Sequence, residues 1–401
     1  MITPEYKIIF ANDLIGYENH ASLLCDILQV TLGITLPVHS DERKAPTEKE
    51  ILIGHTNRTL SDDCYSGDGA QRLMTYEFIT DGNNLQIACG GPHSARFAVL
   101  ELGKALATGS LDSILNKKFD LTDEHVPHTD GTDVRIMSAN VLGECYINTK
   151  HNGRHACSAE RAEILANLLV TYTPDLVGVQ EMDKNYFKPL RLYFDILKEH
   201  YGLEYAITLT HHDDKTNDCP IIYRSDKYEL DYEKFSPANY DIPARYMTMY
   251  PCGVASTKFT DKQDPNCQIA LISNHWYWEK EDQAPEIPRQ QIDADDLAAE
   301  TKYLEATYPG VRVFSTGDFN SHRFDEKYFK RYLETADAVA AEQIAITNGV
   351  HTPALIHMGY FIDHIVGKKG TFDVLRHAPT KNHSDVMTDH KPIYADIKFI
   401  K

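Results

Sequence analysis

The chain has 401 residues, of which 42% are hydrophobic and 25% charged, a balance typical of folded globular proteins. Its 59 acidic and 40 basic residues give a formal net charge of −19, which excludes a globally basic surface for binding polyanions. A chain of this length exceeds one ordinary core, so we expect two domains. No apolar run approaches the length of a transmembrane helix.

The amino terminus, MITPEYKIIFAND, lacks a basic stretch followed by an apolar one. We therefore expect no signal peptide and a cytoplasmic protein, although a secreted chain trimmed of its signal would have the same sequence. The eight cysteines include no Cys-x-x-Cys pair, which argues against zinc-finger and thioredoxin-like sites. We expect free, buried thiols in a reducing compartment.

Residues 1–115 are predicted to form a small α/β domain. Short apolar runs predict strands at 7–11, 50–54, 74–80 and 84–91. Apolar residues at helical spacing predict helices at 19–33 and 94–107. Gly90 and Gly91 precede the second helix, where they would allow close packing of strand and helix. A phosphate-binding turn is the alternative, but the G-x-G-x-x-G spacing is missing.

Residues 116–132 are polar, contain Pro and Gly, and are predicted to be a linker. A second domain, 133–401, begins with the strand-like run VRIMSANVL. Further strands are predicted at 175–181, 220–224, 253–259, 268–276, 311–320, 360–367 and 393–400. Helices are predicted at 158–172, 289–307 and 326–336. Alternating strands and helices usually favour parallel α/β sheets.

Four strings in this second domain place acidic, amide or imidazole side chains at the ends of apolar runs. They are VQEMD (179–183), SNHWYWE (273–279), STGDFNS (315–321) and MTDHKPI (387–393). Strands that end in such residues can bring them together at one edge of a sheet. This assortment suits a magnesium-dependent attack of water on a phosphate ester.

The order and content of these strings resemble the endonuclease/exonuclease/phosphatase superfamily, the DNase I-like phosphoesterases, over about residues 130–401. Seven positions, the last of them a pair of neighbouring residues, stand in the family's order. They are Asn140 in RIMSANVL, Glu181 in Gln-Glu, His275 in SNHW, Asp318 and Asn320 in Gly-Asp-x-Asn, Asp363 in FIDHIVG, and the pair Asp389-His390. The chain departs from the family's pattern at Ser273 and Trp276, beside His275, and at Thr388, where the family has Ser.

The resemblance implies an α+β fold, a four-layer DNase I-like α/β sandwich of two packed mixed sheets with outer helices, preceded here by the small α/β domain. It also implies a site for Mg²⁺ or Mn²⁺. The expected metal ligands are Glu181, Asn140 and Asp389.

The catalytic residues expected from the resemblance are His275, Asp318, Asn320, Asp363 and His390. We expect Asp318 to position water for in-line attack, and Asp363 to orient His390. The side chains of His275, Asn320 and His390 would stabilise the charge that builds on the phosphate oxygens. Taken alone, Gly-Asp-Phe-Asn could equally form a turn, but the preceding apolar run VRVF favours the end of a strand.

Other polar and aromatic residues carry weaker signals. His151 and His155 have a spacing that could bind zinc, but Asn152-Gly153 favours a loop. The run 211–214, His-His-Asp-Asp, is predicted to be a solvated loop, with metal binding as the alternative. Among Trp276, Tyr277 and Trp278, at least one could stack on a substrate ring, and core packing is equally expected for the others. Weaker candidates for the substrate side are Asn217, Arg245 and Tyr246.

The net charge favours a small phosphodiester, a lipid head group or a sugar phosphate as substrate over nucleic acid. A nuclease would need a basic cleft assembled from dispersed residues such as Arg224, Arg245, Arg289 and Arg323. Inositol polyphosphate 5-phosphatases usually have Trp-Cys-Asp-Arg on the late strand, whereas this chain has Phe361-Ile362-Asp363-His364. That difference argues against this subfamily.

The first domain resembles the small accessory domain found in front of several glycoside hydrolase barrels. The matching pieces are TLGITLPV, EILIGHT and GGPHSARFAVLELGKAL. This likeness raises a rival interpretation from another class of protein, a glycan-associated binding protein with an inactive phosphoesterase fold. The full set of catalytic residue types argues against an inactive site.

Overall fold

The computed structural model describes residues 2–14, 16–66, 73–143, 156–208, 219–237, 253–277, 288–321, 326–348, 362–381 and 387–400. The chain divides into two compact units. The front unit comprises Met1–Glu124, Ala156–Thr171 and Lys188–Tyr201, and the sandwich unit comprises His125–His155, Tyr172–Phe187 and Gly202–Lys401. In the ranges given above, no helix combines the length and the apolar character needed to cross a bilayer.

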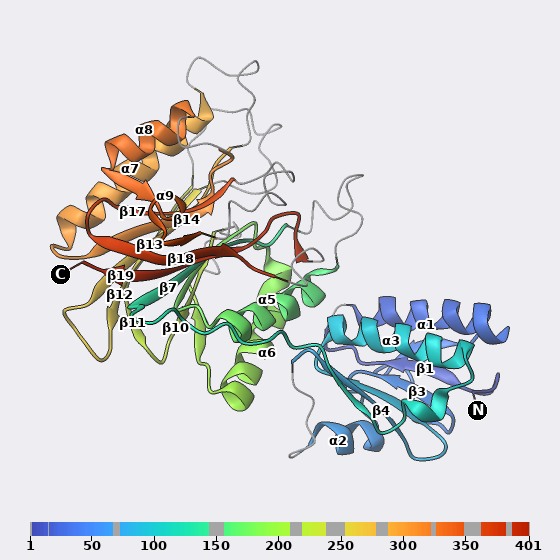
Figure 1. Cartoon of the computed structure of the whole chain (residues 1–401). Coiled ribbons are helices and arrows are strands. Elements are labelled where there is room, and N and C mark those ends of the chain that lie inside the picture. Colours follow the sequence, from blue (N-terminus) through green and yellow to red (C-terminus); the bar gives the residue numbers. More distant parts are fainter. Residues whose placement is uncertain are drawn as a thin grey trace. The chain divides into compact units, whose positions relative to one another are not determined.

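The front unit contains a six-stranded sheet of order β2-β1-β3-β5-β4-β6. Figure 1 labels its strands β1, β3 and β4. Its strands are β1 (Lys7–Phe10), β2 (Val38–Ser40), β3 (Glu50–Ile53), β4 (Thr75–Thr80), β5 (Leu85–Cys89) and β6 (Lys118–Asp120). Its early helices are α1 (Tyr17–Leu32), α2 (Thr59–Tyr65), α3 (Pro92–Ala107) and the 3-10 turn η2 (Leu111–Ser113). All strands and helices predicted in this part are confirmed. The short elements β2, α2, η2 and β6 were not predicted, because three to seven residues carry little periodicity.

Two helices from later in the chain belong to the front unit over most of their length, namely α5 (Ser158–Tyr172) and α6 (Lys184–Tyr201). The buried Glu163 of α5 accepts hydrogen bonds from the backbone N–H of His93 at 2.7 Å, of Ser94 at 3.3 Å and of Met74 at 3.2 Å. Burial raises the pKa of Glu163 to about 7. A Cβ on Gly91 would lie 2.3 Å from Glu163 Oε2, so only glycine fits there. The amino end of α3 thus receives a carboxylate from the protein itself, which leaves the phosphate-binding alternative without support.

The expected linker, 116–132, is bound at both of its ends. Near its start, β6 pairs with β4 in the front sheet. Further along, the fully buried Arg135 of the sandwich unit donates to the carbonyls of Val126 and Pro127, both at 2.8 Å, and to Asp396 at 2.5 Å. Because a buried guanidinium needs acceptors for its five N–H donors, these carbonyls hold the segment in place.

The sandwich unit contains two mixed sheets, as the resemblance implied and not the parallel sheets that alternation alone favoured. The first has the order β16-β18-β19-β7-β8-β10-β9, and the second has the order β11-β12-β13-β14-β17-β15. The strands of the first are β7 (Val134–Asn140), β8 (Leu176–Gln180), β9 (Tyr205–Ile207), β10 (Ile221–Arg224), β16 (Thr347–Asn348), β18 (Phe372–Pro379) and β19 (Ile393–Phe399). Those of the second are β11 (Tyr228–Pro237), β12 (Gly253–Asp261), β13 (Gln268–His275), β14 (Arg312–Asp318), β15 (Ala338–Ala340) and β17 (Asp363–Lys368).

Two hydrophobic cores hold the sandwich unit together. Between the sheets, Ile136 and Leu176 of the first sheet cluster with Leu271, Phe314 and other side chains of the second. The outer face of the second sheet is covered by α7 (Arg289–Thr307) and α8 (Lys327–Thr335), both predicted (Figure 1). Alternation along the strands supplies both cores, because successive side chains point to opposite faces.

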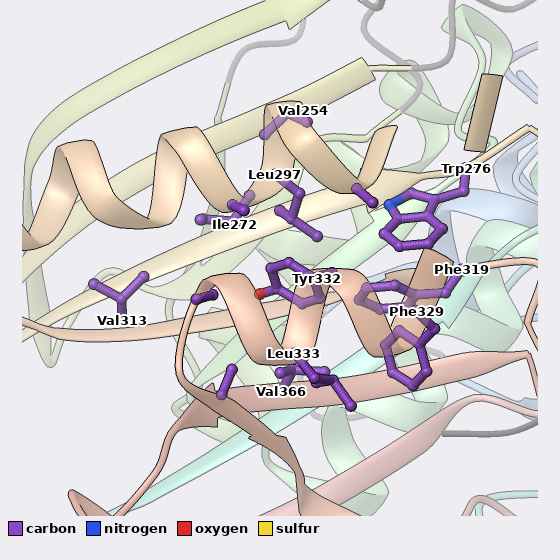
Figure 2. Packing of buried hydrophobic residues seen from close by; sticks show 14 of the residues in the cluster. Val254, Ile272, Trp276, Leu297, Val313, Phe319, Phe329, Tyr332, Leu333 and Val366 are labelled. Carbon is purple, nitrogen blue, oxygen red and sulfur yellow. The ribbon is translucent and has the colours of Figure 1, made fainter. Parts of the chain in front are cut away.

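The core under α7 and α8 is rich in aromatic rings (Figure 2). Trp276 lies 5.0 Å from Phe319 and 6.2 Å from Phe329, measured between ring centroids. Tyr332 of α8 completes the group, and its hydroxyl lies 2.7 Å from Ser315 Oγ. We call Trp276, Phe319, Phe329 and Tyr332 the aromatic cluster. Two of its members, Trp276 and Phe319, directly follow residues expected at the active site.

Cys64 and Cys89 are free, buried thiols, as expected, whereas the free thiols Cys25 and Cys267 are only partly buried. The pKa of Cys64 is raised to about 11 and that of Cys89 to about 12, in both cases mainly by burial, which disfavours the thiolate. Cys145 and Cys252 lie outside the described residues.

Candidate active site

One edge of the sandwich collects the predicted polar residues because of the direction of its strands. In the first sheet β7 and β8 are parallel, so Asn140 at the end of β7 lies beside Gln180, and Glu181 follows. In the second sheet the parallel strands β13 and β14 pair His275 with Asp318. The antiparallel strand β17 begins with Asp363, directly opposite Asp318. Strand ends from both sheets therefore meet at the same edge.

Four of these side chains approach one another closely across the two sheets. Asn140 Nδ2 donates to Glu181 Oε1 at 2.9 Å and lies 3.3 Å from Asp318 Oδ2. His275 Nε2 lies 3.8 Å from Glu181 Oε1 and 3.7 Å from Asp318 Oδ2. Asn140, Glu181 and Asp318 are all buried. Two carboxylates, an amide and an imidazole thus share one partly enclosed space.

The backbone at this edge adopts left-handed conformations that side chains rarely favour. Glu181 has φ 59°, Leu142 has φ 58° and Asn320 has φ 46°. Each of them follows the end of a strand that carries a site residue. The conformation of Leu142 lets its N–H donate to Asn140 Oδ1 at 3.0 Å, and the N–H of Gly143 donates to Glu181 Oε2 at 3.0 Å. Backbone strain of this kind concentrates where neighbouring structure enforces a functional geometry.

His390 is held by a carboxylate, as expected. Its Nδ1 lies 2.7 Å from Asp363 Oδ2, while its Nε2 lies 3.3 Å from Asn140 Nδ2 and 3.7 Å from Asp318 Oδ2. A carboxylate on one ring nitrogen orients the ring and makes the other nitrogen more basic. The orienting role of Asp363 stays a prediction, and this contact is the geometry that it requires.

Burial and charge shift the titration of two groups at this edge. Burial raises the pKa of Asp318 to about 6, an effect that the neighbouring His390 opposes. Burial alone would lower the pKa of His390, but the charges of Asp363, Asp318 and Asp389 raise it well above its ordinary value. Perturbed pKa values grouped in one place are typical of catalytic sites.

The site offers a set of atoms that could hold a metal ion. One ligand atom each from Glu181, His275 and Asp318 lie within 4.8 Å of one another. In the described part of the chain, the ion-pair partners of these two carboxylates are imidazoles and not Lys or Arg. Two buried carboxylates that pair with no Lys or Arg among the described residues suit a divalent ion that accepts oxygen ligands, so the residues present fit Mg²⁺ or Mn²⁺.

Two of the three expected ligands are placed differently from Glu181. The amide oxygen of Asn140 accepts from the Leu142 N–H, so its amino group faces the carboxylates. As placed, Asn140 orients the carboxylates by donating hydrogen bonds. The side chain of Asp389 is 45% exposed, and its Oδ1 lies 4.0 Å from His390 Nε2. Metal binding by Asn140 and Asp389 stays a prediction.

Asn320 is fixed by three hydrogen bonds around the turn after β14. Its N–H donates to Asp318 Oδ1 at 2.8 Å, and its Nδ2 donates to the carbonyl of Trp276 at 2.7 Å. Its own carbonyl lies 3.4 Å from Gln290 Nε2 at the start of α7. The side chain thus binds backbone here, and its expected contact with phosphate stays a prediction.

Of the two described aromatic residues that follow His275, one is buried in the core and the other is partly exposed. Trp276 is 2% exposed and belongs to the aromatic cluster, so it serves the core. Tyr277 is partly exposed, and the Arg289 guanidinium lies 4.3 Å from its ring centroid. Trp278 lies outside the described residues, as do the other weak candidates. These are His151, His155, residues 211–214, Asn217, Arg245, Tyr246 and Arg323.

Several contacts that shape the site could not be predicted from the sequence. Gln180 Nε2 donates to Ser273 Oγ at 3.0 Å, which links the two sheets below Glu181. Gln290 bridges the carbonyls of Tyr277, at 3.0 Å, and Asn320. Backbone donors such as the Gly143 N–H are invisible in any sequence pattern. Gln180 belongs to the Gln-Glu motif, but no pattern in the sequence predicts its partner Ser273 on the other sheet.

No protein-family profile matches the chain. Two curated relatives match part of it. A probable RNA exonuclease of Schizosaccharomyces pombe is 26% identical over 271 residues, which are 66% of this chain and 52% of that protein. A probable RNA exonuclease of Saccharomyces cerevisiae is 25% identical over 159 residues, 37% of this chain and 30% of that protein. The chain therefore spans about half of one relative and less than a third of the other.

Solved structures provide a separate comparison. An endonuclease/exonuclease/phosphatase from Bacteroides vulgatus superposes with a TM-score of 0.51 at 22% identity, covering 67% of this chain and all of that one. A mannosyl-6-phosphatase of Bacteroides thetaiotaomicron gives a TM-score of 0.50 at 16% identity, again over 67% of this chain and all of its own. Together with the two mixed sheets and the ordered strand-end residues, these likenesses show that the chain has the DNase I-like fold of the endonuclease/exonuclease/phosphatase superfamily.

Proposed function

We propose that the protein is a divalent-metal-dependent phosphoesterase that hydrolyses its substrate by in-line attack of water. The observation that carries this proposal is the meeting of Glu181, His275 and Asp318 within 4.8 Å, with the pair His390–Asp363 beside them. The fold and the probable RNA exonucleases among the relatives support the same reaction class.

The residues have separate tasks in this reaction. Glu181 would hold Mg²⁺ or Mn²⁺ in the space that it shares with His275 and Asp318, and the bound ion would supply positive charge to the phosphate oxygens. Asp318 accepts a proton from water and aims the water oxygen at phosphorus, a role that its position between His275 and His390 supports. His390, oriented by Asp363, donates to the phosphate oxygens as charge develops on them. Asn140 keeps the carboxylates aligned through its amino group.

We propose a small phosphate ester as the substrate class, in line with the net charge of −19. Of the arginines that a nuclease cleft would use, Arg224 forms an ion pair with Asp226 at 2.6 Å. The backbone N–H of Arg224 donates to the carbonyl of Asp175, which precedes β8 at the end opposite Glu181. Arg289 lies on Tyr277, two residues after His275, and could contact one additional anionic group of a substrate.

RNA is the second candidate substrate, and one specific observation favours it: both curated relatives are named probable RNA exonucleases. The expected likeness of the front unit to glycoside hydrolase accessory domains, and any association with carbohydrate, stay predictions.

The proposed function is tested by a hydrolysis screen with the full chain. The panel contains sugar phosphates, nucleotides, small phosphodiesters, lipid head-group esters and short RNA, each with Mg²⁺, with Mn²⁺ and with EDTA. We expect metal-dependent release of phosphate or of an alcohol from at least one ester class. Hydrolysis that persists undiminished in EDTA, or no hydrolysis of any ester with either metal, would contradict the proposal.

A further inference from the structure

His364, the second residue of β17, is a buried imidazole on the opposite face of the strand from Asp363. Its side chain is 2% exposed. The ring stacks on Phe329 with centroids 4.6 Å apart and meets the edge of Phe319 at 5.6 Å. Both phenyl rings belong to the aromatic cluster (Figure 2). A histidine in such apolar surroundings is costly unless both of its ring nitrogens find partners.

Both nitrogens of His364 do find partners, and both partners are acceptors. Nε2 lies 2.9 Å from the backbone carbonyl of Ser321. Nδ1 is hydrogen-bonded to the carboxylate of Glu342, which lies on the short helix α9 (Ala341–Ile344). A carbonyl and a carboxylate are satisfied together when the ring donates from both nitrogens and therefore carries a positive charge. Charge-assisted hydrogen bonds of this kind are stronger than neutral ones.

The charges of the two residues support this assignment. Burial alone would lower the pKa of His364, but the Glu342 carboxylate raises it above its ordinary value. Burial alone would raise the pKa of Glu342, but His364 lowers it. His364 and Glu342 thus form an ion pair inside the core. His364 also binds a backbone carbonyl, and Glu342 Oε2 lies 3.9 Å from a second imidazole nitrogen, Nε2 of His377.

The carbonyl that His364 binds belongs to the turn carrying the proposed catalytic residues. Ser321 follows Asp318-Phe319-Asn320, and Asn320 has a left-handed φ of 46°. Asparagine adopts this conformation more readily than most other side chains, and the contacts around the turn fix it here. The turn is held from one side by Asn320 Nδ2 on the Trp276 carbonyl at 2.7 Å, and by Phe319 within the aromatic cluster. The bond from His364 fixes the far end of the same turn.

We propose that His364 is a positioning residue, which holds Asp318 and Asn320 in their working geometry by binding the Ser321 carbonyl while Glu342 anchors its ring. It touches neither substrate nor metal. The inference rests on the proposed phosphoesterase function and extends it from the site's edge to the core behind the second sheet. Small displacements of positioned groups cost large factors in rate, so the effect is expected mainly in kcat.

The experiment compares His364→Phe with a matched control, Tyr332→Phe, in the full chain. Phenylalanine at 364 keeps the stacking and removes both hydrogen bonds. The control removes one buried hydrogen bond, to Ser315, from the same aromatic cluster. We expect His364→Phe to lower kcat at least about tenfold, with KM changed by less than about twofold. The control is expected to lower Tm while keeping kcat within about twofold of the parent.

A double-mutant cycle with Asn320→Ala provides the specific readout. If His364 acts through the turn, the double variant loses little more kcat than Asn320→Ala alone. Losses that multiply fully, or a parental kcat for His364→Phe, would overturn the inference. If His364→Phe does not fold, Glu342→Gln decides, because it keeps an acceptor but removes the charge. A kcat reduced about threefold or more supports the inference, and an unchanged kcat overturns it.

The two proposals fail in different ways. A parent protein that hydrolyses no ester in the presence of metal refutes the phosphoesterase function. An active parent with an equally active His364→Phe variant refutes only the positioning role.

Discussion

Asp318 and Asp363 lie directly opposite each other in the antiparallel pair of β14 and β17, yet they meet different atoms of the same imidazole. Asp363 Oδ2 lies 2.7 Å from His390 Nδ1, and Asp318 Oδ2 lies 3.7 Å from His390 Nε2. The two carboxylates therefore contact opposite nitrogens of the ring. Because the β-ladder fixes both carboxylates, these contacts follow from strand register.

Removing the metal or its principal carboxylate should abolish activity. We expect EDTA to stop hydrolysis and Mg²⁺ or Mn²⁺ to restore it, because the ligands include hard oxygen atoms. Glu181→Ala should lose most activity and most Mn²⁺ binding, measured by calorimetry, while circular dichroism stays unchanged. Glu229→Ala, which removes an exposed carboxylate of β11, serves as control. Full activity of Glu181→Ala in chelator would end the metal hypothesis.

The imidazoles should contribute mainly to the chemical step. His275→Ala and His390→Ala are each expected to lower kcat about 10²-fold or more, the usual scale for acid–base and electrostatic groups. Asp363→Asn should cause a smaller loss, because the ring remains but is less well oriented. Steady-state kinetics with melting curves checks this. An Asp363→Asn variant as inactive as His390→Ala and also thermally unstable would instead show a structural role.

A fragment that begins near Val134 should retain the chemistry, since every proposed catalytic residue lies beyond that point. It should melt at a lower temperature than the full chain, because α5 keeps Glu163 but loses Met74, His93 and Ser94 as hydrogen-bond donors. Exposed apolar surface of α5 and α6 should also make it less soluble. The measurements are kcat and Tm of both proteins. A folded but inactive fragment would show that the front unit contributes to the site.

The stability of the front unit should depend on pH through Glu163. Its pKa is raised by burial from 4.5 to about 7. Between these values the folded chain binds a proton at Glu163 that the unfolded chain has released. The free energy of unfolding should therefore fall as pH rises from about 4.5 to about 7, by roughly 3 kcal/mol from this group. Glu163→Gln should lose this slope, and the exposed Glu18→Gln should keep it. The free energy of unfolding is measured by urea denaturation at several pH values. If it changed equally with pH in all three proteins, the assignment would be refuted.

Substrate class separates the two proposed activities. A nuclease neutralises several phosphates, so its affinity falls steeply with salt. With a net charge of −19 we expect weak, non-saturating binding to DNA and RNA at physiological salt, and turnover of a small ester. The assay compares plasmid DNA, single-stranded RNA and the ester panel at one Mg²⁺ concentration. Dominant cleavage of nucleic acid would mean that dispersed arginines such as Arg289 form a local basic cleft.

The strand ends that carry the polar residues at this edge of the sandwich could be predicted from the sequence, because the signals for a strand and its end lie in neighbouring residues. An apolar run followed by Glu181, His275 or Asp318 marks the end of a buried strand, and two-residue periodicity decides which face each side chain takes. The predicted strands through β13, β14 and β19 and the helices α7 and α8 are confirmed for the same reason. The longer strands β11 and β18 were not predicted, and a register shift interrupts the regular alternation of each. The helix α6 was not predicted either, although it buries Tyr186, Leu190, Tyr193 and Leu197 at helical spacing, because its internal Pro189 argues against a helix.

The partnerships within the site were decided only by tertiary structure. Asn140 and Asp318 are 178 residues apart, and the amino group of Asn140 faces the carboxylates because the Leu142 N–H takes its oxygen. No periodicity encodes such an orientation. The same holds for the Ser321 carbonyl bound by His364, because a backbone acceptor has no residue type to recognise.

The sequence by itself determined the reaction class expected for this protein and the strands that would carry it. Tertiary structure alone decided that α5 and α6 join the front unit and that Glu163 completes the amino end of α3. It also decided that two carboxylates share one imidazole. The physical reason is that strand and helix signals arise from neighbours along the chain. Buried hydrogen bonds instead join groups that only the closing of the core brings within reach.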